Sequence, residues 1–222
     1  MNWTVSVGDQ TTSAIYDPGS GDIIADTVFI CAHGAGGNKL DGSMQKTAKA
    51  LTARGVNLVR FNFLYKERKS DRPDPMPRLQ ECYSAVVDHA RSELSPKRVI
   101  IGGRSMGGRA ASMMAADGFD CNGLLLYAYP LHPPGQPEKL RDAHLPSIKV
   151  PVLCFNGTRD PFCTPALMET AIASVTTDWT MRWIDSADHS FHVPKSSGRN
   201  DSQVMDEIAD TSASWIRSRI GR

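Results

Sequence analysis

The sequence lacks the features that define several broad classes of protein. It has no run of about 18 apolar residues, so no transmembrane helix is predicted. Met1–Gln10 contains no basic stretch followed by an apolar one, so no secretory signal is expected. Basic and acidic residues nearly balance, at 25 against 24, which argues against nucleic acid or an anionic membrane as the main partner.

Cysteine is scarce and scattered. The five cysteines are odd in number and no two have CxxC spacing, so neither a zinc site nor a disulfide framework is predicted. Buried, reduced thiols and a cytoplasmic location are expected instead. The sequence also has no internal repeat or low-complexity segment, and a length of 222 residues predicts a single domain over residues 1–222.

Apolar runs of strand length alternate with longer segments of helical periodicity. This alternation predicts an α/β protein with a mostly parallel central sheet and helices on both faces. Residues before Asp26 are expected to add one or two antiparallel edge strands. The proline-rich segment Pro130–Ile148 is predicted as a loop with one short helix, and no insertion is large enough for a sizeable lid. The predicted strands are Thr27–Ala32, Asn57–Phe63, Arg98–Gly103, Gly123–Tyr129, Val150–Asn156 and Trp179–Asp185. The predicted helices cover residues 40–51, 79–90, 106–116, 165–172 and 204–216.

A GxSxG pattern, Gly103-Arg104-Ser105-Met106-Gly107, lies between a predicted strand and a predicted helix. A serine on such a tight turn projects its hydroxyl above the sheet, beside a helix N-terminus that favours negative charge. The two outer glycines remove side chains that would collide across the turn. Ser105 is therefore the candidate nucleophile, and the alternative is a glycine-rich turn with an incidental serine.

A serine nucleophile needs a base, and after this kind of turn an acid and then a histidine follow in the chain. Asp160 comes just after the strand Val150–Asn156, so its carboxylate is expected at the C-terminal edge of the sheet; an Asp-Pro turn is the alternative interpretation. His189 and His192 both follow the last strand. His189 is preferred because it lies in the first turn beyond that strand.

Small residues follow the first buried strand, in the segment His33-Gly34-Ala35-Gly36-Gly37. They allow backbone N–H groups to turn towards a reacting carbonyl oxygen, so Ala35 or Gly36 is expected to form an oxyanion hole with the N–H of Met106. His33 is expected to brace this loop, and a catalytic role is the alternative interpretation. Aromatic side chains in nearby loops are the expected substrate contacts: Tyr65, Tyr129, Phe162 and Phe191.

Taken in order, HGAGG, FNF, GGRSMGGR, YPLHPPG, NGTRDPF and ADHSF resemble the motifs of small lidless α/β-hydrolases related to dienelactone hydrolase. That group includes bacterial hydrolases and relatives named as testis-expressed or chromatin-complex proteins. The resemblance implies the α/β-hydrolase fold, with nucleophile, acid and base roles for Ser105, Asp160 and His189. Dienelactone hydrolase itself uses a cysteine nucleophile, so the resemblance does not extend to dienelactone cleavage.

These residues predict a serine hydrolase that cleaves a carboxylic ester or thioester of a small acyl substrate through an acyl-enzyme. No metal or organic cofactor is needed for that chemistry. Two alternatives stay open: a non-catalytic binding module that keeps the fold as a scaffold, and a peptidase or acyltransferase with the same triad. The sequence carries no signal for an oligomeric state.

The run Lys66–Arg72 mixes charges of both signs after a predicted strand. A solvated loop is the simpler interpretation. The alternative is a rim that attracts an anionic substrate, to be dropped if neutralising Arg68, Lys69 and Arg72 leaves kcat/KM unchanged for acidic and neutral esters.

Overall fold

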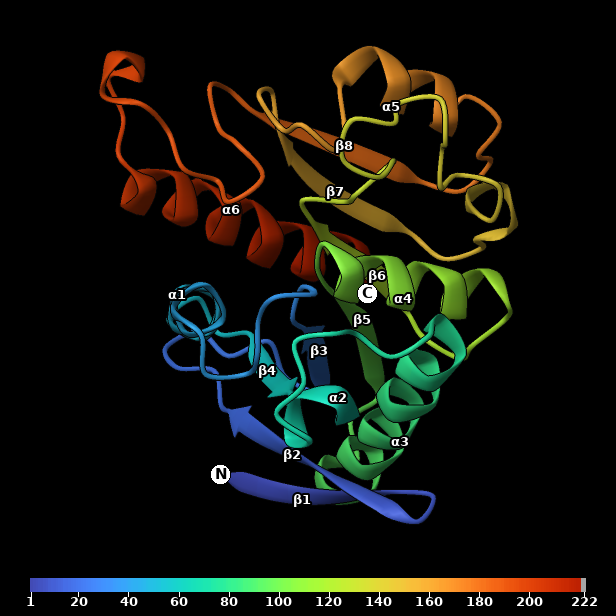
Figure 1. Cartoon of the computed structure of the whole chain (residues 1–222). Coiled ribbons are helices and arrows are strands. Elements are labelled where there is room, and N and C mark those ends of the chain that lie inside the picture. The colour runs from blue at the N-terminus through green and yellow to red at the C-terminus, as the bar shows by residue number, and fades with distance from the viewer. Residues whose placement is uncertain (221–222) are drawn as a thin grey trace.

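The computed structural model describes residues 1–220, and its strands form one eight-stranded sheet (Figure 1). The strands are β1 Asn2–Val7, β2 Gln10–Asp17, β3 Thr27–Ala32, β4 Asn57–Phe61, β5 Arg98–Arg104, β6 Gly123–Tyr127, β7 Val152–Gly157 and β8 Trp179–Ile184. The α-helices are α1 Gly42–Thr52, α2 Leu64–Glu67, α3 Met76–Leu94, α4 Met106–Ala116, α5 Pro165–Ile172 and α6 Asp201–Trp215. Short helical turns of other types are η1 Leu145–Ser147, η2 Lys195–Ser197 and η3 Ile216–Ile220.

The sheet has the strand order β1-β2-β4-β3-β5-β6-β7-β8. The pairs β1–β2 and β2–β4 are antiparallel, and all other pairs are parallel. Every residue of β3, β6 and β7 is buried, which explains their continuous apolar runs. In β1, by contrast, buried Trp3, Val5 and Val7 alternate with exposed residues, as expected at an edge. The predicted α/β class and the antiparallel N-terminal edge are confirmed.

Two apolar cores lie on opposite faces of the sheet. Phe29 of β3 belongs to the core that contains the buried side chains of α1 and α6. Its neighbour Ile30 belongs to the core that contains those of α3, α4 and α5, because successive strand residues point to opposite faces. Figure 1 shows α1 and α6 together on one side, away from α3 and α4. Helices therefore cover both faces, as predicted.

Local hydrogen bonds decide where several elements begin and end. The predicted helices Met106–Ala116 and Pro165–Ile172 have these bounds in the structure. The C-terminal helix begins earlier than predicted, at Asp201, because Asn200 and Gln203 form a capping box. The prediction that the second strand reaches Phe63 was wrong. The strand β4 ends at Phe61, and the Phe63 N–H donates to the His33 ring. The helix α2 begins at the next residue, Leu64.

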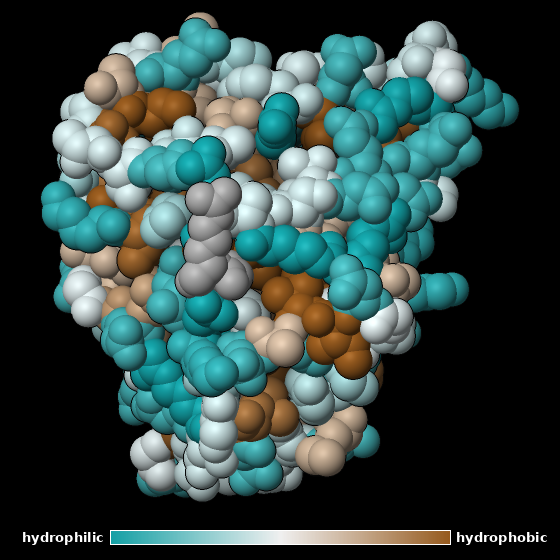
Figure 2. All heavy atoms as spheres, turned by 180° about the vertical axis from the view of Figure 1, so that it is seen from behind, coloured by the Kyte–Doolittle hydropathy of each residue, from teal (hydrophilic) through white to brown (hydrophobic). Residues whose placement is uncertain are grey.

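The surface is mostly polar. The exposed large hydrophobic side chains within residues 1–220 are those of Met1, Ile23 and Leu40. Figure 2 shows one face, on which hydrophobic groups form separate small areas between hydrophilic ones. No helix in this part of the chain is both long and apolar enough to span a bilayer. All five cysteines are free and buried, as predicted.

The strand order places two loops side by side at the C-terminal edge of the sheet. β3 lies between β4 and β5, so the connection after β3 leads to one side and the connection after β5 to the other. Open α/β sheets bind ligands at such a point. Ala32 and Gly103 are register partners near the ends of these strands. The loop after β3 and the turn after β5 therefore meet.

Candidate active site

Ser105 occupies a strained turn between β5 and α4. Its backbone has φ 50° and ψ −117°, a conformation that is rare for residues other than glycine. The turn is fixed on both sides, because the Ser105 N–H donates to Tyr127 O at 2.9 Å and Ser105 O accepts from the Arg109 N–H at 3.0 Å. Glycine is required beside it. A Cβ on Gly107 would lie 2.6 Å from His33 O, which supports the reason given for the GxSxG pattern.

Three side chains from three different loops meet at this turn. His189 Nε2 lies 3.0 Å from Ser105 Oγ, and His189 Nδ1 lies 2.8 Å from Asp160 Oδ2. Asp160 is 2% exposed and the His189 side chain is 21% exposed. The structure thus brings the predicted serine, histidine and acid together in hydrogen-bonding order.

Asp160 is held by two donors besides His189. Its Oδ2 accepts from Asn156 Nδ2 at 3.1 Å, and its Oδ1 accepts from the Phe162 N–H at 2.8 Å. Asn156 is fully buried and also bonds the N–H and the carbonyl of Tyr129, each at 3.1 Å. Asn156 was not predicted as a site residue. The one signal for it was a polar residue at the end of an apolar strand, four positions before the acid.

The loop that carries His189 is organised by its neighbours. Asp188 Oδ1 accepts from the N–H groups of Ser190 at 2.7 Å and His192 at 3.0 Å. Arg104, which precedes the candidate nucleophile, donates from Nη2 to His189 O at 2.5 Å. The acid loop is tied to the same segment, because the Arg159 N–H donates to Ala187 O at 2.9 Å.

The geometry distinguishes His189 from His192. The ring of His192 points to Asp201, with Nδ1 3.0 Å from a carboxylate oxygen, and its side chain is 63% exposed. The hydrogen bond that the His192 ring donates to Asp201 raises the pKa of His192. His189 is the histidine that contacts both Ser105 and Asp160.

The loop after β3 lies against the nucleophile turn. A Cβ on Gly34 would be 3.5 Å from Ser105 Cβ. The Gly37 N–H donates to Gly34 O at 3.0 Å, whereas the N–H groups of Ala35 and Gly36 have no acceptor within residues 1–220. The N–H of Met106, in the first turn of α4, has no i−4 partner in the helix. The three predicted oxyanion donors are therefore unengaged, and Ala35 and Gly36 directly follow the residue of this loop that lies against Ser105.

His33 braces this loop from inside the core. Its Nε2 accepts from the Phe63 N–H at 3.2 Å, so the ring proton is on Nδ1, which lies 2.7 Å from Gly34 O. Burial lowers the pKa of His33 to about 4, so the ring is neutral near pH 7. This arrangement agrees with the bracing role expected from the sequence.

The predicted substrate contacts fall into two groups. Phe162 is partly exposed, and its ring centroid lies 4.4 Å from that of His189, at the mouth of the site. Tyr65 and Tyr129 are fully buried, and their hydroxyls donate to Ala35 O at 2.7 Å and Arg141 O at 2.8 Å. These two tyrosines are therefore reassigned as supports of the site. Phe191 is 3% exposed and its ring packs under Arg104, so it too is better described as a support.

The mixed-charge run is largely neutralised by its own neighbours. Lys66 pairs with Asp71 at 2.8 Å, and Arg68 pairs with Asp74. This pairing favours the interpretation as a solvated loop. Within residues 1–220, no three His, Cys, Asp or Glu side chains are grouped so that they could hold a metal ion.

The α/β hydrolase domain family matches residues 25–217, which is most of the chain. This chain belongs to the α/β-hydrolase domain family. The match includes all three residues that meet at the nucleophile turn, and it confirms the resemblance seen in the sequence motifs.

Solved structures similar to this α/β hydrolase share its fold over nearly the whole chain. A serine hydrolase homologue from Coxiella burnetii has 19% identity and a TM-score of 0.77, covering 95% of this chain and 96% of that one. A lidless serine hydrolase from Xanthomonas campestris has 18% identity and a TM-score of 0.77, covering 97% and 94%. A dienelactone hydrolase from Anabaena variabilis has 21% identity and a TM-score of 0.76, covering 99% and 97%.

Proposed function

We propose that this α/β hydrolase is a serine hydrolase that cleaves carboxylic esters or thioesters through an acyl-enzyme. The observation that carries the proposal is the continuous hydrogen-bonded chain from Ser105 Oγ through His189 to Asp160, at 3.0 and 2.8 Å. A serine hydroxyl becomes a competent nucleophile when a neighbouring imidazole can take its proton and a carboxylate orients that imidazole.

In the first half-reaction, Ser105 Oγ attacks the substrate carbonyl and His189 Nε2 takes the hydroxyl proton. Asp160 accepts the Nδ1–H of His189, which leaves Nε2 free as the base, and it stabilises the imidazolium that forms. Negative charge develops on the carbonyl oxygen. The N–H groups of Met106 and of Ala35 or Gly36 receive it, because none of them is engaged within the described part of the chain.

Collapse of the tetrahedral intermediate breaks the ester or thioester bond, and His189 donates its proton to the leaving alcohol or thiol. Water then attacks the acyl group on Ser105 by the same route in reverse and releases the acid. The partly exposed ring of Phe162 beside His189 forms one wall for the substrate. We propose small acyl esters as the substrates of this site; within residues 1–220, no lid-sized insertion covers this edge of the sheet.

The direct test is labelling with a fluorophosphonate probe, followed by hydrolysis of nitrophenyl esters and acyl-CoA thioesters. Ser105→Ala should abolish labelling and reduce kcat by about 10⁶-fold if the triad acts as a unit. Ser92→Ala, on the exposed surface of α3, is the matched control and should leave both unchanged. Absence of labelling in the wild-type protein would identify a non-catalytic scaffold instead.

The two histidines after β8 offer a second matched pair. His189→Gln should reduce kcat by several orders of magnitude, whereas His192→Gln should retain activity because its partner is Asp201. Equal losses in both variants would contradict the assigned base. Assays with amide substrates distinguish ester hydrolysis from peptidase activity. Ester assays with added alcohol or amine acceptors distinguish hydrolysis from acyltransferase activity.

A further inference from the structure

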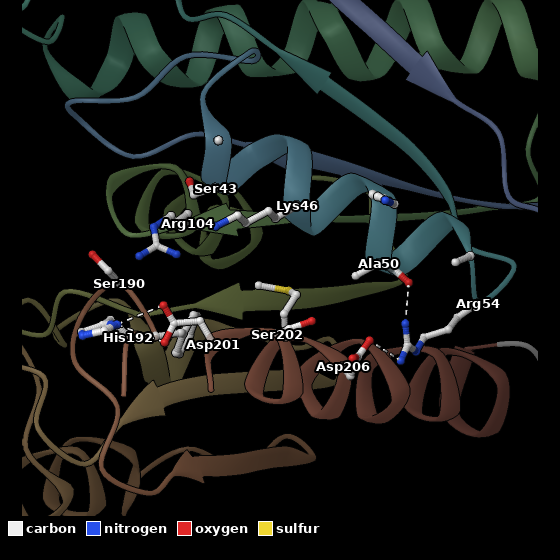
Figure 3. Close-up of a pocket in the computed structure, with 15 residues that line it drawn as sticks. Ser43, Lys46, Ala50, Arg54, Arg104, Ser190, His192, Asp201, Ser202 and Asp206 are labelled. Atoms are coloured by element: carbon white, nitrogen blue, oxygen red, sulfur yellow. Dashed lines mark hydrogen bonds and ion pairs between the residues drawn. The ribbon is translucent and has the colours of Figure 1, made fainter. Parts of the chain in front are cut away.

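A cavity of about 630 Å³ lies between α1 and α6, on the face of the sheet opposite α4 (Figure 3). It is next to the catalytic loops, because Arg104 and Ser190 are among its lining residues and each neighbours a triad residue in the chain. Ser105 and His189 themselves do not line it. The cavity is therefore separate from the proposed ester-cleaving site.

Positive charge in this cavity exceeds what its own carboxylates neutralise. Arg54 is fully paired, with Asp210 at 2.6 Å and Asp206 at 3.0 Å. Asp201 is bonded to His192 at 3.0 Å and to the Val193 N–H at 3.1 Å. The remaining lining cations, Lys46, Lys49 and Arg104, have no carboxylate within ion-pair distance in residues 1–220.

Arg104 is the most informative of these cations. Of its five N–H donors, one is used, in the bond to His189 O. Its guanidinium lies over the ring of Phe191, at 5.5 Å from the centroid, and is mostly buried. Burial lowers the pKa of Arg104, although the charges of Asp41, Asp160 and Asp188 act in the opposite direction. None of these carboxylates forms an ion pair with Arg104, so within residues 1–220 its remaining N–H donors are free to bind an anion in the cavity.

Further donors are grouped at the same end of the cavity. Figure 3 shows the Lys46 side chain directed towards Arg104, with Ser43 and Ser190 on either side. The N–H groups of Gly42 and Ser43, at the start of α1, have no acceptor within residues 1–220. The Asp41 carboxylate caps this helix N-terminus and accepts from the Met44 N–H at 2.8 Å, so the two free N–H groups add donors but no net positive charge.

The cavity also has an apolar part. Ala50, Ala53, Met205 and Phe191 are among its lining residues, beside polar residues such as Ser202. A simple inorganic anion would leave this surface uncovered, whereas an anion with an attached hydrocarbon chain would bury it.

We propose that the α1–α6 cavity binds a small amphiphilic anion, with its phosphate or carboxylate group at Arg104 and Lys46 and its apolar chain against Ala50 and Met205. The shared chemistry is an oxyanion on a short alkyl chain. A free molecule is favoured over an anionic lipid surface because the site is a hollow between two helices and because acidic and basic residues nearly balance over the whole chain.

The test is calorimetric titration of the whole protein with n-octyl phosphate, inorganic phosphate and n-octanol. Octyl phosphate should bind saturably with one molecule per chain, and each of the other two compounds should bind at least about tenfold more weakly, because each lacks one half of the recognised chemistry. Equal affinity for inorganic phosphate would overturn the amphiphile assignment. Equal affinity for octanol would overturn the anion site.

Variants locate the site. Lys46→Gln, an exposed position that leaves the core intact, should weaken octyl phosphate binding about tenfold. Lys97→Gln, an exposed lysine paired with Asp26 away from the cavity, should leave binding unchanged. Equal affinities in the two variants, or no saturable binding by the wild type, would refute the proposal.

Two further arms separate this proposal from its neighbours. Ser105→Ala should bind octyl phosphate as the wild type does, because binding requires no chemistry; the proposal therefore stands or fails independently of ester cleavage. Binding to phosphatidylglycerol vesicles without binding to monomeric octyl phosphate would overturn the small-molecule assignment in favour of a lipid surface.

Discussion

Asn156→Leu should damage both the fold and the proposed chemistry, because one buried amide serves both. The side chain bonds the N–H and the carbonyl of Tyr129 and also Asp160, each at 3.1 Å. Leucine has a similar size but leaves the buried Tyr129 N–H without a partner, whereas Tyr129 O still accepts from the Leu131 N–H at 3.1 Å. At about 1–3 kcal/mol for one unsatisfied group, the free energy of unfolding should fall by roughly 1–3 kcal/mol. Urea denaturation followed by fluorescence measures this change.

The same variant removes one of the donors that fix the Asp160 carboxylate, so we expect kcat towards a nitrophenyl ester to fall about tenfold in the folded protein. Asn122→Leu is the matched control. Its Oδ1 accepts from the Val99 N–H at 2.7 Å, near the start of β5 and far from the triad in the sheet. The control should lose stability but keep kcat. An unfolding free energy within 1 kcal/mol of wild type for Asn156→Leu, or an equal loss of kcat in the control, would refute the reasoning.

Three other predictions concern packing, pH and thiol reactivity. Gly107→Ala places a Cβ 2.6 Å from His33 O and should lower the free energy of unfolding by about 1–3 kcal/mol or more. In Gly42→Ala the new Cβ meets no atom within 4 Å, so the free energy of unfolding should change by less than about 0.5 kcal/mol. Similar Tm values for the two variants would contradict this prediction. The pKa of His33 is about 4 in the folded protein and about 6.5 in the unfolded chain. Between these pH values the unfolded chain therefore binds one more proton than the folded protein. The free energy of unfolding should fall as pH decreases from about 6.5 to 4, by up to ~1.4 kcal/mol per pH unit. Denaturant unfolding at several pH values should show a smaller slope for His33→Gln. Burial raises the pKa values of the cysteine thiols, so a disulfide reagent should label the native protein slowly and the urea-unfolded protein at all five positions; rapid native labelling would contradict their burial.

The sequence predicted the sheet well because the parallel strands are buried on both faces. A strand buried on both faces is a continuous run of apolar residues, such as Val28, Phe29 and Ile30, and such a run is easily recognised in the sequence. The strand β3 has the predicted bounds. Prediction was poorest where a backbone N–H donates to a side chain from a distant segment of the chain. The second strand ends two residues early because the Phe63 N–H donates to His33, thirty positions away in the chain, and no local pattern contains that partner.

The candidate site shows the same contrast between residues placed by the strands and contacts made by distant side chains. Ser105, Asp160 and His189 each come just after a predicted strand, and parallel strands end at the same edge of a sheet, so their positions and their order along the chain brought them together in the prediction. The supporting contacts depend on side-chain directions that spacing does not give. Tyr65 and Tyr129 were expected at the surface of the pocket because aromatic residues commonly line pockets, yet both are in the core with bonded hydroxyls.

The tie between the acid loop and the histidine loop has a consequence for how new specificity can arise in this protein. A Cβ on Gly157 would lie 2.1 Å from Ala187 O, so these two connections are in contact and tolerate little change in length. The segment around Gly135 has no such constraint, since a Cβ there meets no atom within 4 Å. Insertions that cover the candidate site, or change which substrates it accepts, are therefore best accommodated in that segment, where they leave the positions of Ser105, Asp160 and His189 unchanged.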